Sequence, residues 1–175
     1  MGIRQTYVRI TPDELTFLHQ CQSDKEVWDF LAQPHHKPFF FWPLDEAESL
    51  ASYRQLCIEK SWWETLQGVV ALQMHNDPTP IWDTVEDGTP IRDFWIGYGP
   101  LRFLTPDEVQ RFLGTLQAIP DASLHQRFLH DWANIEMEPD EKEQYFLGFL
   151  DCYQTLVKFV HEAFDNGEVL VWRIS

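Results

Sequence analysis

The residues best suited to bind a small molecule lie in and just after a stretch rich in proline and glycine, from His75 to Pro100. They are His75, Asp93, Tyr98 and Arg102, which offer an imidazole, a carboxylate, a phenol and a guanidinium. A guanidinium binds a carboxylate or a phosphate through paired N–H groups, so Arg102 would orient an acid. We therefore predict that these residues line a concave, partly apolar pocket. The alternative is that Arg102 pairs with one of the chain's own 28 Asp and Glu residues.

No histidines have the spacing of a metal centre. His35 and His36 are adjacent, so they point in different directions on any regular element. His125 and His130 are five residues apart, and two helical metal ligands are better placed four apart. The sequence also lacks the G-x-S-x-G motif of a serine nucleophile. We predict no metal ligand, no cofactor and no catalytic residue, and we lean away from an enzyme.

The cysteines indicate reduced thiols rather than a disulfide framework. Cys21, Cys57 and Cys152 stand far apart, and no two of them form a C-x-x-C pair. Scattered cysteines in odd number are typical of a reducing compartment. No apolar run resembles a signal peptide or approaches the roughly 20 residues that span a bilayer. We expect a cytoplasmic protein without a membrane partner.

The net charge excludes one class of partner and favours another. The chain has 13 Lys and Arg against 28 Asp and Glu, a formal charge of −15. Such a protein lacks the basic patch on which affinity for nucleic acid mostly rests. A basic protein partner or a cation would be attracted instead.

Aromatic residues make up 15% of the chain, which is high, and one run of them is bracketed by prolines. In an extended run, Phe39 and Phe41 would point to one face. Phe40 and Trp42 would point to the other, so both faces need cover from this chain or from a partner. Trp63 lies beside the apolar stripe of a predicted helix, where it would be exposed. These five residues are the predicted partner-binding surface.

The tetrapeptide TPDE occurs twice, and we interpret both copies as helix starts. Thr11 and Thr105 are each followed three residues later by a glutamate, Glu14 and Glu108, which is the pattern of a capping box. The proline takes the first helical position, where its missing N–H costs nothing. Beyond the cap the two segments differ, so we expect two independent caps rather than a duplicated site.

The remaining elements follow from apolar periodicity and β-forming residues. Further helices are predicted after Ser23, after Asp45 through Leu56, after Ser61, and from Pro139 to Asp165. Short strands are predicted at Tyr7–Ile10, around 94–96 and at Glu168–Ile174. The segment from His75 to Pro100 is predicted to be a long loop. The sequence thus indicates one α+β domain over residues 1–175, mostly helical, with short strands at the N-terminus, centre and C-terminus.

Several segments together resemble the YfbM-like family, small bacterial proteins of unknown function. They are Ile58-Glu59-Lys60-Ser61-Trp62, the run from Tyr98 to Val109, Ile135 to Pro139, and the Gly-Glu-Val-Leu-Val ending. The similarity extends over most of the chain. It implies a small bacterial, cytoplasmic α+β protein, and it brings no activity, cofactor or catalytic residue with it.

Two functions remain open at the level of the sequence. The first is a non-enzymatic module that binds another, basic protein through aromatic residues and negative charge. The second is a small-molecule binder or enzyme with its site at residues 75–102. We prefer the first, because no residues have catalytic spacing. The sequence does not specify the oligomeric state.

Overall fold

The computed structural model describes residues 4–33, 38–40, 54–75 and 88–174, and for residues 38–40 and 71–75 it describes the backbone only. Within these residues, six strands form one sheet in the order β2-β3-β1-β6-β5-β4. The strands are β1 (Arg4–Ile10), β2 (Pro38–Phe40), β3 (Gln55–Glu59), β4 (Thr89–Trp95), β5 (Pro100–Leu104) and β6 (Val169–Ile174). Neighbouring strands are antiparallel except for β2 and β3.

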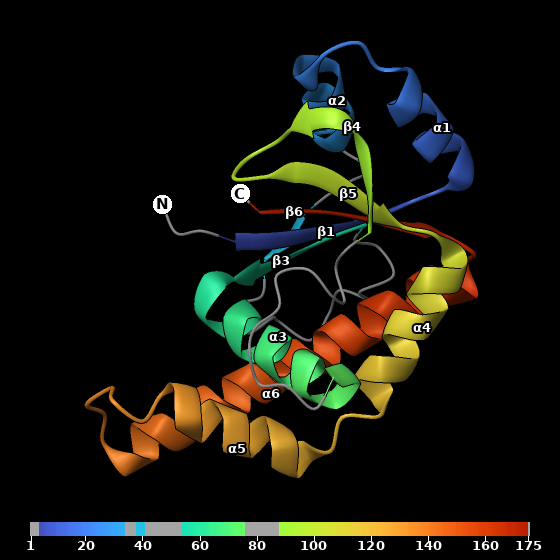
Figure 1. Cartoon of the computed structure of the whole chain (residues 1–175). Coiled ribbons are helices and arrows are strands. Elements are labelled where there is room, and N and C mark those ends of the chain that lie inside the picture. The colour runs from blue at the N-terminus through green and yellow to red at the C-terminus, as the bar shows by residue number, and fades with distance from the viewer. Residues whose placement is uncertain (1–3, 34–37, 41–53, 76–87, 175) are drawn as a thin grey trace.

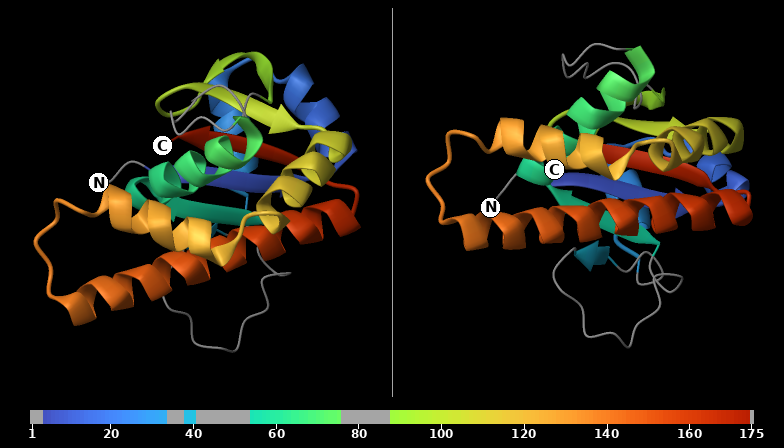
Figure 2. Two further views of the ribbon diagram at one scale, coloured as in Figure 1. Left: turned by 60° about the horizontal axis from the view of Figure 1, so that its bottom comes forward. Right: turned by 90° about the horizontal axis from the view of Figure 1, so that it is seen from below.

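The helices of the described residues lie on the two faces of this sheet (Figure 1). They are α1 (Pro12–Gln20), α2 (Asp24–Leu31), α3 (Lys60–His75), α4 (Pro106–Gln117), α5 (Asp121–Asp131) and α6 (Pro139–Asp165). α1 and α2 cover one face, and α3 to α6 cover the other. Figure 2 shows the long helix α6 running across the second face. The mostly helical α+β fold predicted from the sequence is confirmed.

The strand register explains why the core has two parts. Tyr7 lies opposite Leu56 on one side and Trp172 on the other, so all three face α3 to α6. The alternate residues of β1 face α1 and α2, and Val8 and Ile10 are buried there. A strand shows successive side chains to opposite faces, and both faces of this central strand are buried.

The helix starts at Thr11, Ser23 and Thr105 are as predicted, whereas α3 begins at Lys60, before the predicted cap Ser61, and the start predicted at Asp45 lies outside the described residues. Thr11 and Thr105 each accept the N–H of the glutamate three residues on, and that glutamate accepts the N–H of the threonine in return. Ser23 caps α2 in the same way through the N–H of Glu26. The interpretation of the two TPDE segments as caps is therefore confirmed.

Three parts of the secondary-structure prediction were wrong. Leu56 lies in β3 rather than in a helix. The predicted central loop contains the whole of β4, and β5 follows it. The helix α5 was not predicted at all.

Candidate functional site

A cavity of about 180 Å³ lies between α3, β5, β6 and the turn that joins β4 to β5. Its lining residues come from segments far apart in the sequence: Trp63, Gln67, Tyr98, Gly99, Pro100, Arg102, Trp172 and Ile174. Among these described lining residues, Arg102 alone carries a charge.

The sheet register and one helical turn bring the cavity residues together. Arg102 of β5 lies directly opposite Trp172 of β6, so both side chains project toward α3. Trp63 and Gln67 are four residues apart on α3 and therefore lie on the same face of it. Tyr98 is held in the turn, where its backbone N–H donates to the carbonyl of Ile174 at 2.8 Å.

Gly88 holds the guanidinium of Arg102. Arg102 Nη1 donates to the Gly88 carbonyl at 3.1 Å. Gly88 has φ +32°, and a Cβ there would come within 2.7 Å of the Phe103 carbonyl oxygen and 3.2 Å of Trp172 Nε1. Only glycine fits so close an approach without a shift of the backbone. This position therefore couples the geometry of Arg102 to that of Trp172.

Trp172 brings an unused hydrogen-bond donor to the cavity. The residue is 6% exposed, and within the described part of the chain its indole Nε1 has no hydrogen-bond partner. A buried indole N–H normally finds an acceptor, because leaving it without one costs free energy. An oxygen of a bound molecule could supply the acceptor.

The four predicted ligand-binding residues are brought together only in part. Tyr98 and Arg102 both line the cavity. Asp93 lies exposed on β4 and is not among the described lining residues. His75 is the last residue of α3, and its side chain is outside what the structure describes.

Of the five predicted partner-binding residues, only Trp63 has a side chain that the structure describes. Trp63 is 2% exposed, which contradicts its predicted exposure, because α3 packs on this side as well as on the side of Leu66, and both residues belong to one core cluster. Phe39 and Phe40 belong to β2, with their side chains outside the description, and Phe41 and Trp42 lie outside the described residues. That surface remains a prediction.

Sequence reasoning missed four cavity residues, Trp63, Gln67, Trp172 and Ile174. Trp172 was interpreted only as a β-forming residue, and Trp63 was assigned to the surface. Gln67 carried no signal of its own. The spacing of Trp63 and Gln67 by four residues could have suggested a shared face, but only the sheet register reveals that this face meets Arg102 and Trp172.

A second, larger cavity of about 410 Å³ lies between α3 and α5. Its described lining residues are Ser61, Glu64, Thr65, Gln67, Arg127, Asp131, Trp132 and Ile135. Arg127 Nε donates to Asp131 at 2.8 Å, and its guanidinium lies so close to Gly68 that a Cβ there would come within 2.4 Å of Cζ. Gln67 lines both cavities and therefore lies between them.

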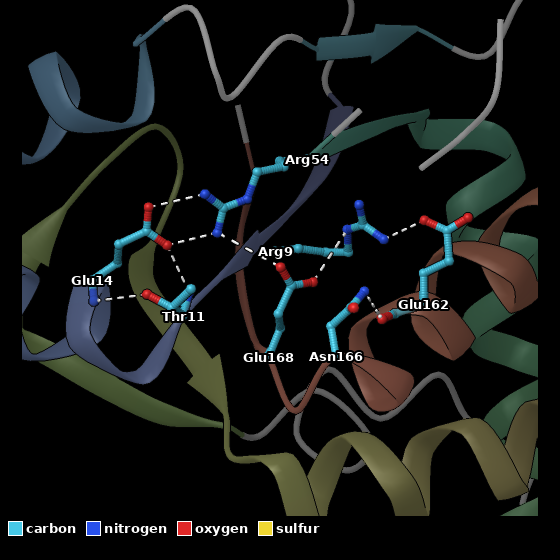
Figure 3. Close-up of polar contacts among 7 residues, drawn as sticks. All are labelled: Arg9, Thr11, Glu14, Arg54, Glu162, Asn166 and Glu168. Atoms are coloured by element: carbon cyan, nitrogen blue, oxygen red, sulfur yellow. Dashed lines mark hydrogen bonds and ion pairs between the residues drawn. The ribbon is translucent and has the colours of Figure 1, made fainter. Parts of the chain in front are cut away.

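A network of charges outside both cavities joins the chain's N-terminal and C-terminal elements (Figure 3). Arg9 pairs with Glu162 of α6 and, at 3.5 Å, with Glu168 before β6. Arg54 pairs with Glu14 at 2.6 Å and lies 3.8 Å from Glu168. Because each of its two cations pairs with carboxylates of the same network and its residues are buried or half-buried, we interpret this network as structural.

The pKa values of two carboxylates in this network shift in opposite directions. Burial alone would raise the pKa of Glu14, but hydrogen bonds from Arg54 and Thr11 outweigh it and lower the pKa to about 2. Burial raises the pKa of Glu168, although Arg9 and Arg54 oppose the shift.

The thiols and carboxylates show no catalytic or metal-binding arrangement in the described ranges. Cys21, Cys57 and Cys152 are buried free thiols, and burial raises the pKa of each. A raised pKa disfavours the thiolate, which is the nucleophilic form. Within these ranges, no three His, Cys, Asp or Glu side chains are grouped to hold a metal ion.

Comparison with known proteins gives the family. The model of a domain of unknown function, DUF1877, matches residues 1–172. This chain belongs to the DUF1877 family. The crystal structure of YfbM from Escherichia coli, a protein of unknown function, is similar over 98% of this chain and 99% of that one. The TM-score is 0.60 and the identity 13%, so this likeness concerns the fold.

The family assignment confirms the YfbM-like resemblance seen in the sequence. No curated protein matches this DUF1877 chain. None of its described helices is long and apolar enough to cross a membrane.

Proposed function

We propose that this protein binds a small planar carboxylic acid in the cavity formed by Trp63, Tyr98, Arg102 and Trp172. One observation carries the proposal: Arg102 and Trp172 occupy paired positions on β5 and β6 and both line the cavity. A carboxylate oxygen could accept from the guanidinium and from the indole N–H of Trp172 together. The ligand is thus an acid rather than a neutral molecule.

The walls and the size of the cavity define the rest of the ligand. Trp63, Pro100 and Ile174 offer flat or apolar surface to its body. An apolar cavity of about 150 Å³ can hold a benzene-sized molecule, so about 180 Å³ suits a single-ring acid. The flat walls suit a planar carboxylate better than a tetrahedral phosphate.

Thermal unfolding with benzoate tests the proposal. Benzoate should raise the Tm saturably, since a ligand that binds only the folded state stabilises it. Arg102→Met should weaken binding about tenfold, equivalent to about 1.4 kcal/mol. Benzyl alcohol, which keeps the ring and lacks the carboxylate, should bind wild-type protein more weakly.

Arg111→Met is the matched control, because Arg111 is exposed on α4 and away from the cavity residues. It removes the same charge and should leave benzoate binding unchanged. Equal responses of wild-type protein and Arg102→Met would contradict the proposal.

Protein binding is the second candidate, favoured by the turn between β4 and β5. Trp95 is 64% exposed and Tyr98 69% exposed, and both lie at this turn. Exposed aromatic residues are typical of contact surfaces. With a net charge of −15, the partner would be basic and the complex salt-sensitive.

An oligolysine peptide tests this candidate as a defined basic partner. Its affinity should fall with added salt and with Trp95→Ala. Binding that is indifferent to both would remove the candidate. In either case we place the protein in the cytoplasm, where its three free thiols would stay reduced.

A further inference from the structure

Among the residues that the structure describes, the buried guanidinium of Arg173 has no counter-ion. Arg173 is 7% exposed, and its Nε and Nη1 have no hydrogen-bond partner in the described part of the chain. None of the ion pairs found there involves it, although the chain has a large excess of carboxylates. A buried charge is normally paired, because leaving water without compensation is costly.

The side chains directly across the sheet from Arg173 are polar and uncharged, and the nearest charged residue along that face of β1 is another cation, Arg4. Thr6 lies opposite Arg173 on one side and Cys57 on the other, so all three project from the same face. Thr6 Oγ1 lies 3.6 Å from Cys57 Sγ, and Gln55 Nε2 donates to that sulfur at 3.8 Å. The three neighbours are buried, with exposures of 1% for Thr6 and 7% for Gln55 and Cys57.

Trp28 of α2 covers this group from the outside. Its ring centroid lies 4.0 Å from Arg173 Cζ, which is a close cation–π contact. Trp28 itself is 41% exposed, so on this side only its indole separates the guanidinium from solvent. A small solute could reach it by displacing or tilting a single indole.

We propose that Arg173, with Thr6, Gln55 and Cys57 beside it, forms a site for a small oxyanion. A free phosphate or the acidic group of a small metabolite would accept hydrogen bonds from Nε and Nη1 and neutralise the charge. The site lies on the face of the sheet opposite the Arg102 cavity, because Arg173 and Trp172 are consecutive residues of β6. The inference is therefore independent of the proposed function.

The titration behaviour of the group agrees with this assignment. Burial raises the pKa of Cys57, which keeps the thiol neutral and unable to serve as the missing anion. Burial lowers the pKa of Arg173, in the direction expected of a cation that has lost its water.

Thermal unfolding against anion concentration tests the site, with sodium chloride holding the ionic strength constant. Inorganic phosphate forms one arm and acetate the other, to separate a tetrahedral from a planar oxyanion. At least one should raise the Tm saturably in wild-type protein and in Arg111→Met. Arg173→Met should lose that rise, and without anion it should be no less stable than wild type, because it removes an unpaired buried charge. An equal rise in Arg173→Met, or none in wild type, would overturn the proposal.

A second measurement uses the wild-type protein alone and so does not depend on the folding of a variant. N-ethylmaleimide labelling, followed by peptide mass mapping, gives the rate at which each cysteine reacts. The stabilising anion should slow the reaction of Cys57 at least several-fold, with the same midpoint as the Tm rise, since a bound anion occludes the thiol and disfavours its thiolate. Cys21 and Cys152 are internal references: both are buried, so the general stabilisation slows them too, and Cys57 should slow by more than either. An unchanged rate at Cys57 would count against the site.

Discussion

Arg54 donates from Nη1 and Nη2 to the two carboxylate oxygens of Glu14, at 2.9 and 2.6 Å. The same carboxylate accepts the backbone N–H of Thr11 at 2.7 Å and so closes the capping box of α1. One side chain therefore both starts a helix and ties it to the residue before β3. This double role fixes the position of α1 over the sheet, where Leu18 belongs to the core.

Replacing Glu14 by Gln should destabilise the protein by about 1–2 kcal/mol at neutral pH, since a bidentate charge-assisted contact and part of a cap are lost. The pKa of Glu14 falls from 4.5 to about 2 on folding, so its contribution is complete above about pH 5 and declines as the pH falls toward 2. The difference in unfolding free energy between wild type and Glu14→Gln should therefore shrink on acidification.

Urea unfolding between about pH 6 and pH 3 measures that difference. Glu143→Gln, at an exposed position of α6, is the control and should change stability little at any pH. A Glu14→Gln difference that stays constant down to about pH 3 would refute the linkage.

Replacing Arg9 by Met should cost about 3–5 kcal/mol, because it leaves Glu162 and Glu168 without their buried cation. Arg9 is 3% exposed, and its guanidinium also lies 5.1 Å from the Phe159 ring centroid, so packing is lost too. Urea unfolding at neutral pH gives the value, with Arg111→Met as the charge-matched control. A loss below about 1 kcal/mol would mean that the network contributes no more than a surface pair does.

The two glycines Gly68 and Gly114 should respond differently to the same substitution. Both lie inside helices, where Ala is favoured over Gly by about 1 kcal/mol. A Cβ at Gly114 meets nothing within 4 Å, so Gly114→Ala should stabilise by roughly that amount. A Cβ at Gly68 would overlap the Arg127 guanidinium, so Gly68→Ala should bring no gain or a loss. Differential scanning calorimetry compares the two, and an equal gain would mean that Arg127 moves aside freely.

Local sequence signals predicted the parts of the fold that depend on local chemistry. Capping requires only the threonine, the proline and the glutamate of each TPDE segment, and both caps are present. The helix Pro139–Asp165 has the predicted bounds, because its apolar stripe is long and ends at Asn166-Gly167. These signals were strong because residues close together in the sequence supply one another's hydrogen bonds and packing contacts.

The sequence did not predict the features of the fold that depend on tertiary contacts. Leu56 fits an apolar helical stripe as well as it fits a strand, and its pairing with Tyr7 of β1 decides in favour of the strand. β4 buries only Ile91 and Phe94, three residues apart, and has a register shift between Pro90 and Trp95, so its sequence lacks the alternation of a strand and is typical of a loop. The sequence predicted two of the eight described lining residues, Tyr98 and Arg102. The meeting of these two with Trp63, Gln67 and Trp172 is set by strand order, which no local pattern encodes.

Replacing Gly88 by Ala should impair ligand binding without removing any lining side chain. The new Cβ would come within 2.7 Å of the Phe103 carbonyl oxygen and strain a backbone at φ +32°, so Gly88 and the Arg102 guanidinium bonded to it must shift. We expect benzoate affinity to fall several-fold by calorimetric titration. Gly99→Ala is the matched control, since Gly99 also borders the cavity but a Cβ there meets nothing within 4 Å. Equal affinities of the two variants would contradict the role assigned to Gly88.

The most direct test of the proposed acid-binding cavity is the indole N–H resonance of Trp172 in a ¹⁵N-labelled sample, assigned by its loss in Trp172→Phe. The account predicts that benzoate moves this resonance saturably, with the midpoint of the Tm rise, and that Arg102→Met weakens the response. A Trp172 indole resonance that stays in place while benzoate shifts signals elsewhere would show that the acid does not occupy this cavity.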